Sequence, residues 1–167
     1  PGNYQRQGKT LLLLHGWMGD KNEWEEVVMS LIDTLPEDWQ IVAIDLPGHG
    51  EAPIINSERY QSVRGALGME HLSSFVDDDI LESGLSIEHM AAAVLNSVIK
   101  DPTIQHLDAI CGYSLGGRVA LSMSRAFATQ TSEIKETAPL IDTDTKLILL
   151  GSDPGMLLDR KHKNVQE

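Results

Sequence analysis

The residues most able to do chemistry lie in residues 112–116, which read Gly-Tyr-Ser-Leu-Gly. An apolar run precedes this segment and a helix-forming run follows it, so Ser114 falls where a strand turns sharply into a helix. Such a turn, a nucleophile elbow, lifts the serine hydroxyl above the edge of a sheet. The N–H groups at the start of the following helix favour negative charge on a substrate oxygen. The spacing therefore predicts Ser114 as the activated hydroxyl of a catalytic site.

Gly112 and Gly116 stand two residues either side of Ser114. We expect the strand and the helix to press together at these positions so closely that a side chain would clash. The single cysteine, Cys111, lies in the strand before the turn and cannot form an internal disulfide. A buried, inert apolar residue is the favoured interpretation of this cysteine, in preference to a reactive thiol.

The composition limits the classes of partner. The chain has 167 residues, of which 41% are hydrophobic and 23% charged, as in an ordinary globular domain with a sizeable core. Lysine and arginine number 13 against 25 acidic residues, a net charge of −12. This balance argues against nucleic acid and against an anionic membrane as partners, because both attract clustered basic residues. It leaves room for a local cationic pocket that holds a small-molecule acidic substrate.

No secretory signal is visible, and the apolar run 11–14 is too short to span a bilayer. The sequence starts at Pro1 without a methionine, so a targeting segment stays an open question. The compartment is left open between the cytoplasm and a plastid.

The elements that must position Ser114 follow from short apolar runs and helical spacing. Buried strands are predicted at 9–15, 40–46, 107–113 and 146–150. Helices are predicted from Asn22 as N-cap to Pro36, over 87–99 with Ser86 as N-cap, and over 115–128. Residues 51–85 form an irregular excursion, and 129–144 a polar loop. We expect a single domain over 1–167 with its core at 9–151.

Alternating strands and helices imply an α/β fold, a parallel sheet with helices on both faces. Functional residues should lie at the carboxyl ends of its strands. Residues 15–20, 45–50 and 113–115 occupy those ends.

Three motifs, in this order and spacing, resemble the α/β-hydrolase superfamily: L-L-L-L-H-G-W at 11–17, D-L-P-G-H-G at 45–50 and G-Y-S-L-G-G-R-V-A-L at 112–121. Arg118, and the segment L-I-L-L-G-S-D-P-G-M at 147–156, are most similar to the 2-succinyl-6-hydroxy-2,4-cyclohexadiene-1-carboxylate synthase family of menaquinone and phylloquinone biosynthesis. The resemblance implies a partial α/β-hydrolase fold that lacks the cap and the C-terminal strands.

The resemblance also implies how Ser114 would work. The backbone N–H groups of Trp17 and Leu115 would form an oxyanion hole. His15 and Gly16 would shape the turn that presents the Trp17 N–H. From its position, His15 is favoured as a structural hydrogen-bonding residue, in preference to a base.

Substrate contacts come from the same resemblance. Arg118 would hold a substrate carboxylate through charge-assisted hydrogen bonds, with a solvated or ion-paired helix residue as the rival interpretation. Tyr113 would line the pocket. In the family an arginine lies near the substrate in the region of residues 160–163, and the choice between Arg160 and Lys163 stays open. In that family a serine–histidine pair removes a ring proton and pyruvate is eliminated, so the resemblance implies a lyase and not a hydrolase. It implies no metal and no organic cofactor.

A serine needs a histidine oriented by an acid, and in this fold both follow the serine along the chain. Only 53 residues follow Ser114. His162 has the right order, with Asp142, Asp144 or Asp153 as its acid, but no further strand brings it back to the serine. His49 is favoured as structural. We therefore expect the N-terminal half of a longer enzyme or a truncated product.

Two alternative functions stay open beside the lyase: a serine esterase or thioesterase of the same fold, and a non-catalytic fragment or pseudoenzyme. An N-terminal half would also leave strand 146–150 as an exposed apolar edge. We expect such a chain to be poorly soluble or to associate with itself through that edge.

Overall fold

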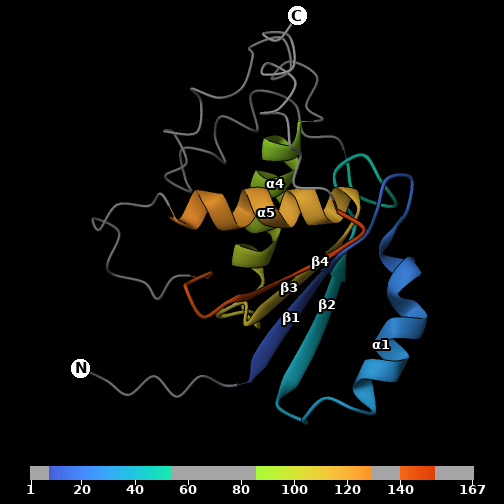
Figure 1. The fold of residues 1–167 in the computed structure, drawn as a ribbon, viewed down its shortest axis with the longest axis vertical. Helices are drawn as coiled ribbons and strands as arrows, with labels where there is room; N and C mark the ends of the chain where they lie inside the picture. Colours follow the sequence, from blue (N-terminus) through green and yellow to red (C-terminus); the bar gives the residue numbers. More distant parts are fainter. Residues whose placement is uncertain (1–7, 54–85, 129–139, 153–167) are drawn as a thin grey trace, which may run out of the picture.

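The computed structural model describes residues 8–53, 86–128 and 140–152, and within them the chain forms a parallel sheet of four strands (Figure 1). The strand order is β2-β1-β3-β4. The strands are β1 (Lys9–Leu14), β2 (Trp39–Ile44), β3 (Ala109–Tyr113) and β4 (Lys146–Leu150). Leu14 is paired with both Ile44 and Gly112, so the carboxyl ends of the three neighbouring strands meet at one edge. The parallel sheet predicted from the sequence is confirmed.

Helices cover both faces of this sheet (Figure 1). On one face, Leu12, Leu14 and Ile110 pack against α4 (Ile87–Lys100) and α5 (Leu115–Ala128). On the other, Leu11 and Leu13 pack against Trp24 of the short 3₁₀ helix η1 (Lys21–Trp24), with α1 (Glu25–Ile32) following it. Successive strand residues point to opposite faces, so each continuous apolar run supplies two cores.

The helix α4 forms as the sequence predicts. The Ser86 side chain caps it by accepting the His89 backbone N–H at 3.2 Å. The expected apolar stripe is fully buried, at Met90, Ala91, Val94, Leu95 and Val98. Cys111 is also buried, as predicted, and burial raises the pKa of its thiol.

The helix after β1 begins differently from the prediction. Asp20, not Asn22, is the N-cap, and its carboxylate accepts the Asn22 N–H at 2.7 Å. The first turn is 3₁₀, and the α-helix ends at Ile32, before Pro36. Beyond it, the N–H groups of Thr34 and Leu35 both donate to the Leu31 carbonyl. The cap was misplaced because Asp and Asn two residues apart are equally good cap residues.

The two outer strands are less buried than predicted. All six residues of β2 are half-buried, and in β4 Ile148, Leu149 and Leu150 are 42%, 36% and 43% exposed. Both strands lie at edges of the described sheet, where a neighbour is present on one side only. The predicted excursion lies outside the described residues from position 54 to 85, as does most of the polar loop, from 129 to 139. Among the described helices, none is long and apolar enough to cross a bilayer.

Candidate active site

Ser114 occupies the turn between β3 and α5 in a backbone conformation that is uncommon for its type. Its φ is 50°, in the left-handed region that residues with a side chain rarely adopt. Such a residue costs on the order of 1–3 kcal/mol and persists where its surroundings enforce it. Here the Ser114 N–H donates to the Leu150 carbonyl at 2.8 Å, which ties the turn to the end of β4.

The glycines on either side of Ser114 allow backbone to meet backbone. A methyl group at Gly112 would lie 2.5 Å from the backbone nitrogen of Gly117, and one at Gly116 would collide with the carbonyl oxygens of Leu14 and His15. Both obstacles are main-chain atoms held in the sheet and in α5, so neither can move aside. The contact between β1, β3 and α5 therefore depends on missing side chains.

The loop after β1 lies against the same turn. A methyl group at Gly16 would lie 2.8 Å from the Tyr113 ring and 3.6 Å from Ser114 Cβ. Trp17 follows immediately and is 63% exposed. The structure therefore brings His15, Gly16 and Trp17 to the edge of the sheet that carries Ser114, because β1 and β3 are neighbours in the sheet.

His15 is buried, and both of its ring nitrogens are engaged. Its Nε2 accepts the Leu46 backbone N–H at 2.9 Å, so the proton is on Nδ1, which donates to the Gly16 carbonyl at 2.8 Å. A ring with both nitrogens occupied holds two loops together and cannot take a proton from Ser114. His49 packs its ring 5.4 Å from that of His15 and 5.3 Å from that of Trp17.

Asp45 ties the loop after β2 to the start of η1, a role that the sequence did not reveal. Its carboxylate accepts the N–H groups of Lys21 at 2.7 Å and Glu51 at 3.0 Å, and the Lys21 ammonium at 3.2 Å. Burial by itself would raise the pKa of Asp45, but these hydrogen bonds and the lysine charge outweigh it and lower the pKa below its ordinary value. In the sequence, Asp45 stands at the start of a glycine-rich turn, and this pattern is the signal that could have indicated its role.

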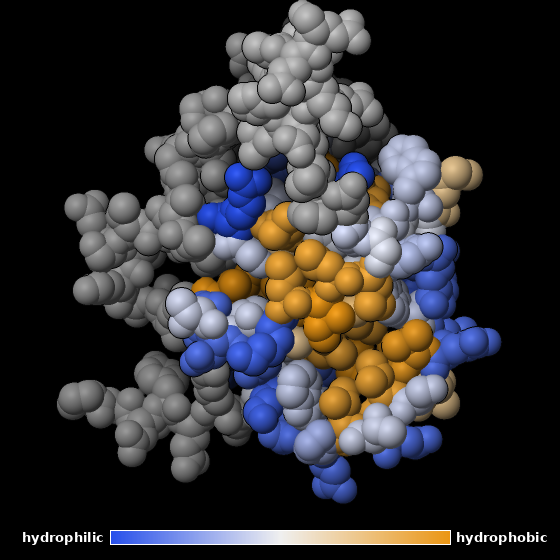
Figure 2. Space-filling model, in the orientation of Figure 1, coloured by the Kyte–Doolittle hydropathy of each residue, from blue (hydrophilic) through white to orange (hydrophobic). Residues whose placement is uncertain are grey.

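Tyr113 is half exposed and lines a cavity of about 260 Å³ beside the Ser114 turn, together with Glu23, Trp24, Val27 and Leu150. The walls are mostly apolar, with Glu23 as the charged member. Figure 2 shows apolar side chains gathered over this region of the sheet.

Arg118 lies one turn into α5 and its side chain is exposed, with no hydrogen-bond or ion-pair partner within the described residues. Its backbone N–H donates to the Ser114 carbonyl at 3.4 Å. The remaining basic candidates, Arg160 and Lys163, and with them His162, fall outside the described residues. Asp153 does too.

Asp142 and Asp144 are not placed to serve as the acid of a Ser114 site. They lie at the amino-terminal end of β4, whereas Ser114 follows the carboxyl end of β3. Both precede β4, and the Asp142 carboxylate accepts the Asp144 N–H at 2.9 Å. Asp142 also lies 3.1 Å from Nε2 of the buried His106, whose Nδ1 is 3.7 Å from Asp108. Burial would raise the pKa of Asp142, but the Asp144 N–H and His106 lower it below its ordinary value.

Ser114 Oγ has no hydrogen-bond partner in the part of the chain that the structure describes. The same part contains no group of three histidine, cysteine or acidic residues that could hold a metal ion.

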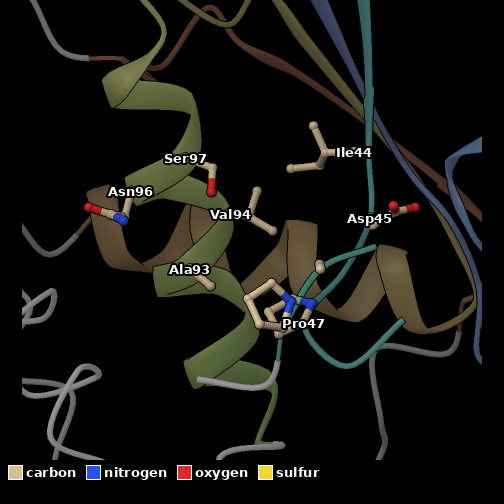
Figure 3. Close-up of a pocket in the computed structure, with 9 residues that line it drawn as sticks. Ile44, Asp45, Pro47, Ala93, Val94, Asn96 and Ser97 are labelled. Carbon is tan, nitrogen blue, oxygen red and sulfur yellow. The ribbon is translucent and has the colours of Figure 1, made fainter. Parts of the chain in front are cut away.

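A second pocket, of about 140 Å³, lies between the end of β2 and α4 (Figure 3). Apolar residues such as Ile44 and Val94 line it, with Asn96 and Ser97 as polar neighbours, and the Asp45 carboxylate points away from α4. It flanks the outer strand of the sheet, with β1 between it and β3, so it is separate from the Ser114 turn.

Comparison with known proteins decides the family. The model of the alpha/beta hydrolase fold family matches residues 9–136, most of the chain, including Ser114 and the loop after β1. The chain belongs to the α/β-hydrolase fold family.

Relatives of this α/β hydrolase are named for different reactions. The 2-succinyl-6-hydroxy-2,4-cyclohexadiene-1-carboxylate synthase of Escherichia coli O1:K1 / APEC is 31% identical over 111 residues, 66% of this chain and 31% of that protein. The biotin biosynthesis bifunctional protein BioHC of Teredinibacter turnerae is 28% identical over 124 residues, 74% of this chain and 16% of that protein. A pimeloyl-[acyl-carrier protein] methyl ester esterase of Neisseria meningitidis is 38% identical over 47 residues, 28% of this chain and 17% of the esterase.

Among solved structures, the esterase RhEst1 from Rhodococcus sp. ECU1013 shares the fold of this α/β hydrolase, with a TM-score of 0.50 and 21% identity over 92% of this chain and 41% of that one. The chain thus spans a third or less of the length of the curated relatives above.

Proposed function

We propose that Ser114 is the catalytic hydroxyl of an enzyme that eliminates pyruvate and so forms a cyclohexadiene carboxylate. The observation that carries this proposal is the left-handed Ser114 at the junction of β3 and α5, beside the loop of Gly16 and Trp17. In this arrangement the backbone N–H groups of Trp17 and Leu115 serve as the oxyanion hole.

Arg118 supports an acidic substrate. An exposed arginine with no partner within the described residues stands one turn after Ser114, in a chain whose net charge is −12. A guanidinium that the described residues leave unengaged is available for a two-point hydrogen bond to a substrate carboxylate. The similarity to synthases that are named for a cyclohexadiene carboxylate covers two thirds of this chain.

The elimination needs a base that removes a proton and an oxyanion hole that stabilises negative charge. A base working through Ser114 takes a proton from the ring, and the released electron pair forms a ring double bond. The bond between the ring and the pyruvate-derived group breaks, and that group leaves with the bonding electron pair as the enolate of pyruvate. The two N–H groups stabilise the negative charge on the oxygen that carries it, and the enolate becomes pyruvate by taking up a proton. None of the described histidines is hydrogen-bonded to Ser114 Oγ, so we place the base outside the described residues.

An ester-hydrolysing activity is the second candidate, and two observations favour it. The esterase relative is 38% identical over 47 residues, and the cavity beside Tyr113 has the mostly apolar wall that an acyl chain requires. Here Ser114 would attack the ester carbonyl, and the same oxyanion hole would hold the tetrahedral intermediate.

The test is Ser114→Ala in the full-length protein, assayed both for pyruvate release with formation of the cyclohexadiene carboxylate and for hydrolysis of short acyl esters. We expect the wild type to release pyruvate, and the variant to lose about a thousandfold or more of that rate, because no other group replaces the hydroxyl. Ser124→Ala is the matched control, since it removes a hydroxyl from α5 that, among the described residues, bonds only the Ala120 carbonyl.

Unchanged pyruvate release in Ser114→Ala would contradict the mechanism. Ester turnover that exceeds pyruvate release, together with labelling of Ser114 by a fluorophosphonate, would favour the esterase instead.

A further inference from the structure

Ser152, in the turn after β4, reaches the backbone of Ser114 with its side chain. Its hydroxyl lies 3.0 Å from the Ser114 carbonyl oxygen and 3.2 Å from the Leu150 carbonyl oxygen. We propose that Ser152 is a positioning residue that orients the peptide group after Ser114, an inference that rests on the proposed role of Ser114.

The end of β4 holds both backbone groups of Ser114. The Ser114 N–H donates to the Leu150 carbonyl at 2.8 Å, and the Ser114 carbonyl accepts the Ser152 hydroxyl. The other donor to this carbonyl, the Arg118 N–H, is at 3.4 Å, which is long for a helix bond. Ser152 is therefore the shorter of the two contacts that fix the direction of this carbonyl in a strained turn.

That carbonyl belongs to the same peptide group as the Leu115 N–H. A trans peptide is planar, and its C=O and N–H point in opposite directions. A donor that holds the Ser114 carbonyl on one side therefore aims the Leu115 N–H to the other. Because the Leu115 N–H is the proposed oxyanion donor, Ser152 sets the angle of a group that acts mainly in the transition state.

Neighbouring glycines make room for this hydroxyl. A methyl group at Gly117 would overlap Ser152 Oγ and lie 2.6 Å from its Cβ, so the Ser152 side chain fits only because residue 117 has none. Gly151 has a φ of 56°, and a methyl group there would lie 3.2 Å from the Tyr113 ring. The turn after β4 therefore packs closely against the chain around Ser114. Gly151 lies against the Tyr113 ring, and Ser152 lies against Gly117 and the Ser114 carbonyl.

The test compares Ser152→Ala with the wild type in the full-length protein, using pyruvate release and p-nitrophenyl acetate hydrolysis as the two assays. We expect kcat to fall roughly tenfold, the order expected for losing one oriented hydrogen bond, while KM changes less than about twofold. Ser152→Thr keeps the hydroxyl and should recover most of kcat. Ser124→Ala, which removes a comparable hydroxyl from the middle of α5, should keep the wild-type kcat.

Each result decides the proposal. A wild-type kcat in Ser152→Ala overturns it, as does a folded Ser152→Thr that recovers nothing, or a loss of kcat explained by a falling melting temperature in Ser152→Ala. If Ser114→Ala keeps its activity, the proposed function fails first. If Ser114→Ala is inactive and Ser152→Ala is not, only the role of Ser152 fails.

Discussion

Gly116 determines how closely α5 approaches the sheet, and two opposing effects act at this position. Alanine favours a helix over glycine by about 1 kcal/mol. A methyl group here would however collide with the carbonyl oxygens of Leu14 and His15, which are fixed in and beside β1. Overpacking against atoms that cannot move costs about 1–3 kcal/mol or more, so the collision outweighs the propensity.

We therefore expect Gly116→Ala to lower the free energy of unfolding by about 1–2 kcal/mol or more, measured by urea denaturation. Gly19→Ala is the matched control, because a methyl group there meets the carboxylate of Glu23, the far end of a side chain that can turn away. A Gly116→Ala variant as stable as the wild type would show that α5 can shift off the sheet.

The turn at Ser114 could be predicted from the sequence, because glycine, serine and glycine at this spacing are typical of a sharp turn from a strand into a helix. The role of Ser152 could not be read in this way. Its partner Ser114 is 38 positions earlier in the chain, and only the pairing of β3 with β4 brings the two together. A hydroxyl at the end of a strand carries no signal of its own.

At the level of elements, Asp45 links the loops after β1 and β2, and its ionisation makes that link depend on pH. Its pKa is lowered in the folded state, so it stabilises the fold above its ordinary pKa of about 3.9 and this contribution is lost as pH falls through the folded-state pKa. The pKa of Asp142, at the amino-terminal end of β4, is lowered too. Its ionisation therefore changes the stability with pH in the same direction.

We expect the free energy of unfolding to fall steadily as the pH is lowered below about 4, in denaturant titrations at a series of pH values. Asp45→Asn should flatten this fall and reduce stability near pH 7, while leaving stability near pH 3 close to that of the wild type. Asp38→Asn, at an exposed carboxylate, should keep the wild-type slope. An Asp45→Asn variant with an unchanged slope would place the dependence elsewhere.

Elements whose signals are local were predicted well, and those that depend on neighbours were not. Residues 115–128 and 146–150 have the bounds expected from helical spacing and from a short apolar run. Exposure of β2 and β4 follows from their place at the edges of the sheet, which periodicity does not encode. Chain order alone makes Asp142 a candidate acid. It lies just before the start of β4, however, and so a full strand length from the serine at the carboxyl ends of the parallel strands.

For the molecule as a whole, β4 forms an edge of the described sheet and pairs there with β3 alone. Ile148, Leu149 and Leu150 leave about two fifths of their surface exposed on this strand. An apolar strand with unpaired backbone N–H and C=O groups is a template for another strand. We propose that a second copy of the chain occupies it, because β4 is a short apolar segment with one charge, Lys146, and is able to pair with itself.

The net charge of −12 opposes this association, since two copies repel each other over distances that salt screens. In sedimentation velocity we expect the 167-residue chain to form dimers or larger species that grow with protein concentration and with salt, from about 0.05 M to about 0.5 M. Ile148→Lys should return it to a monomer, because a charge on an edge strand disfavours pairing. Ile32→Lys, at an exposed apolar residue of α1, should associate like the wild type. A monodisperse monomer at every concentration and salt level would contradict the proposal and leave the exposed β4 without a role in self-association.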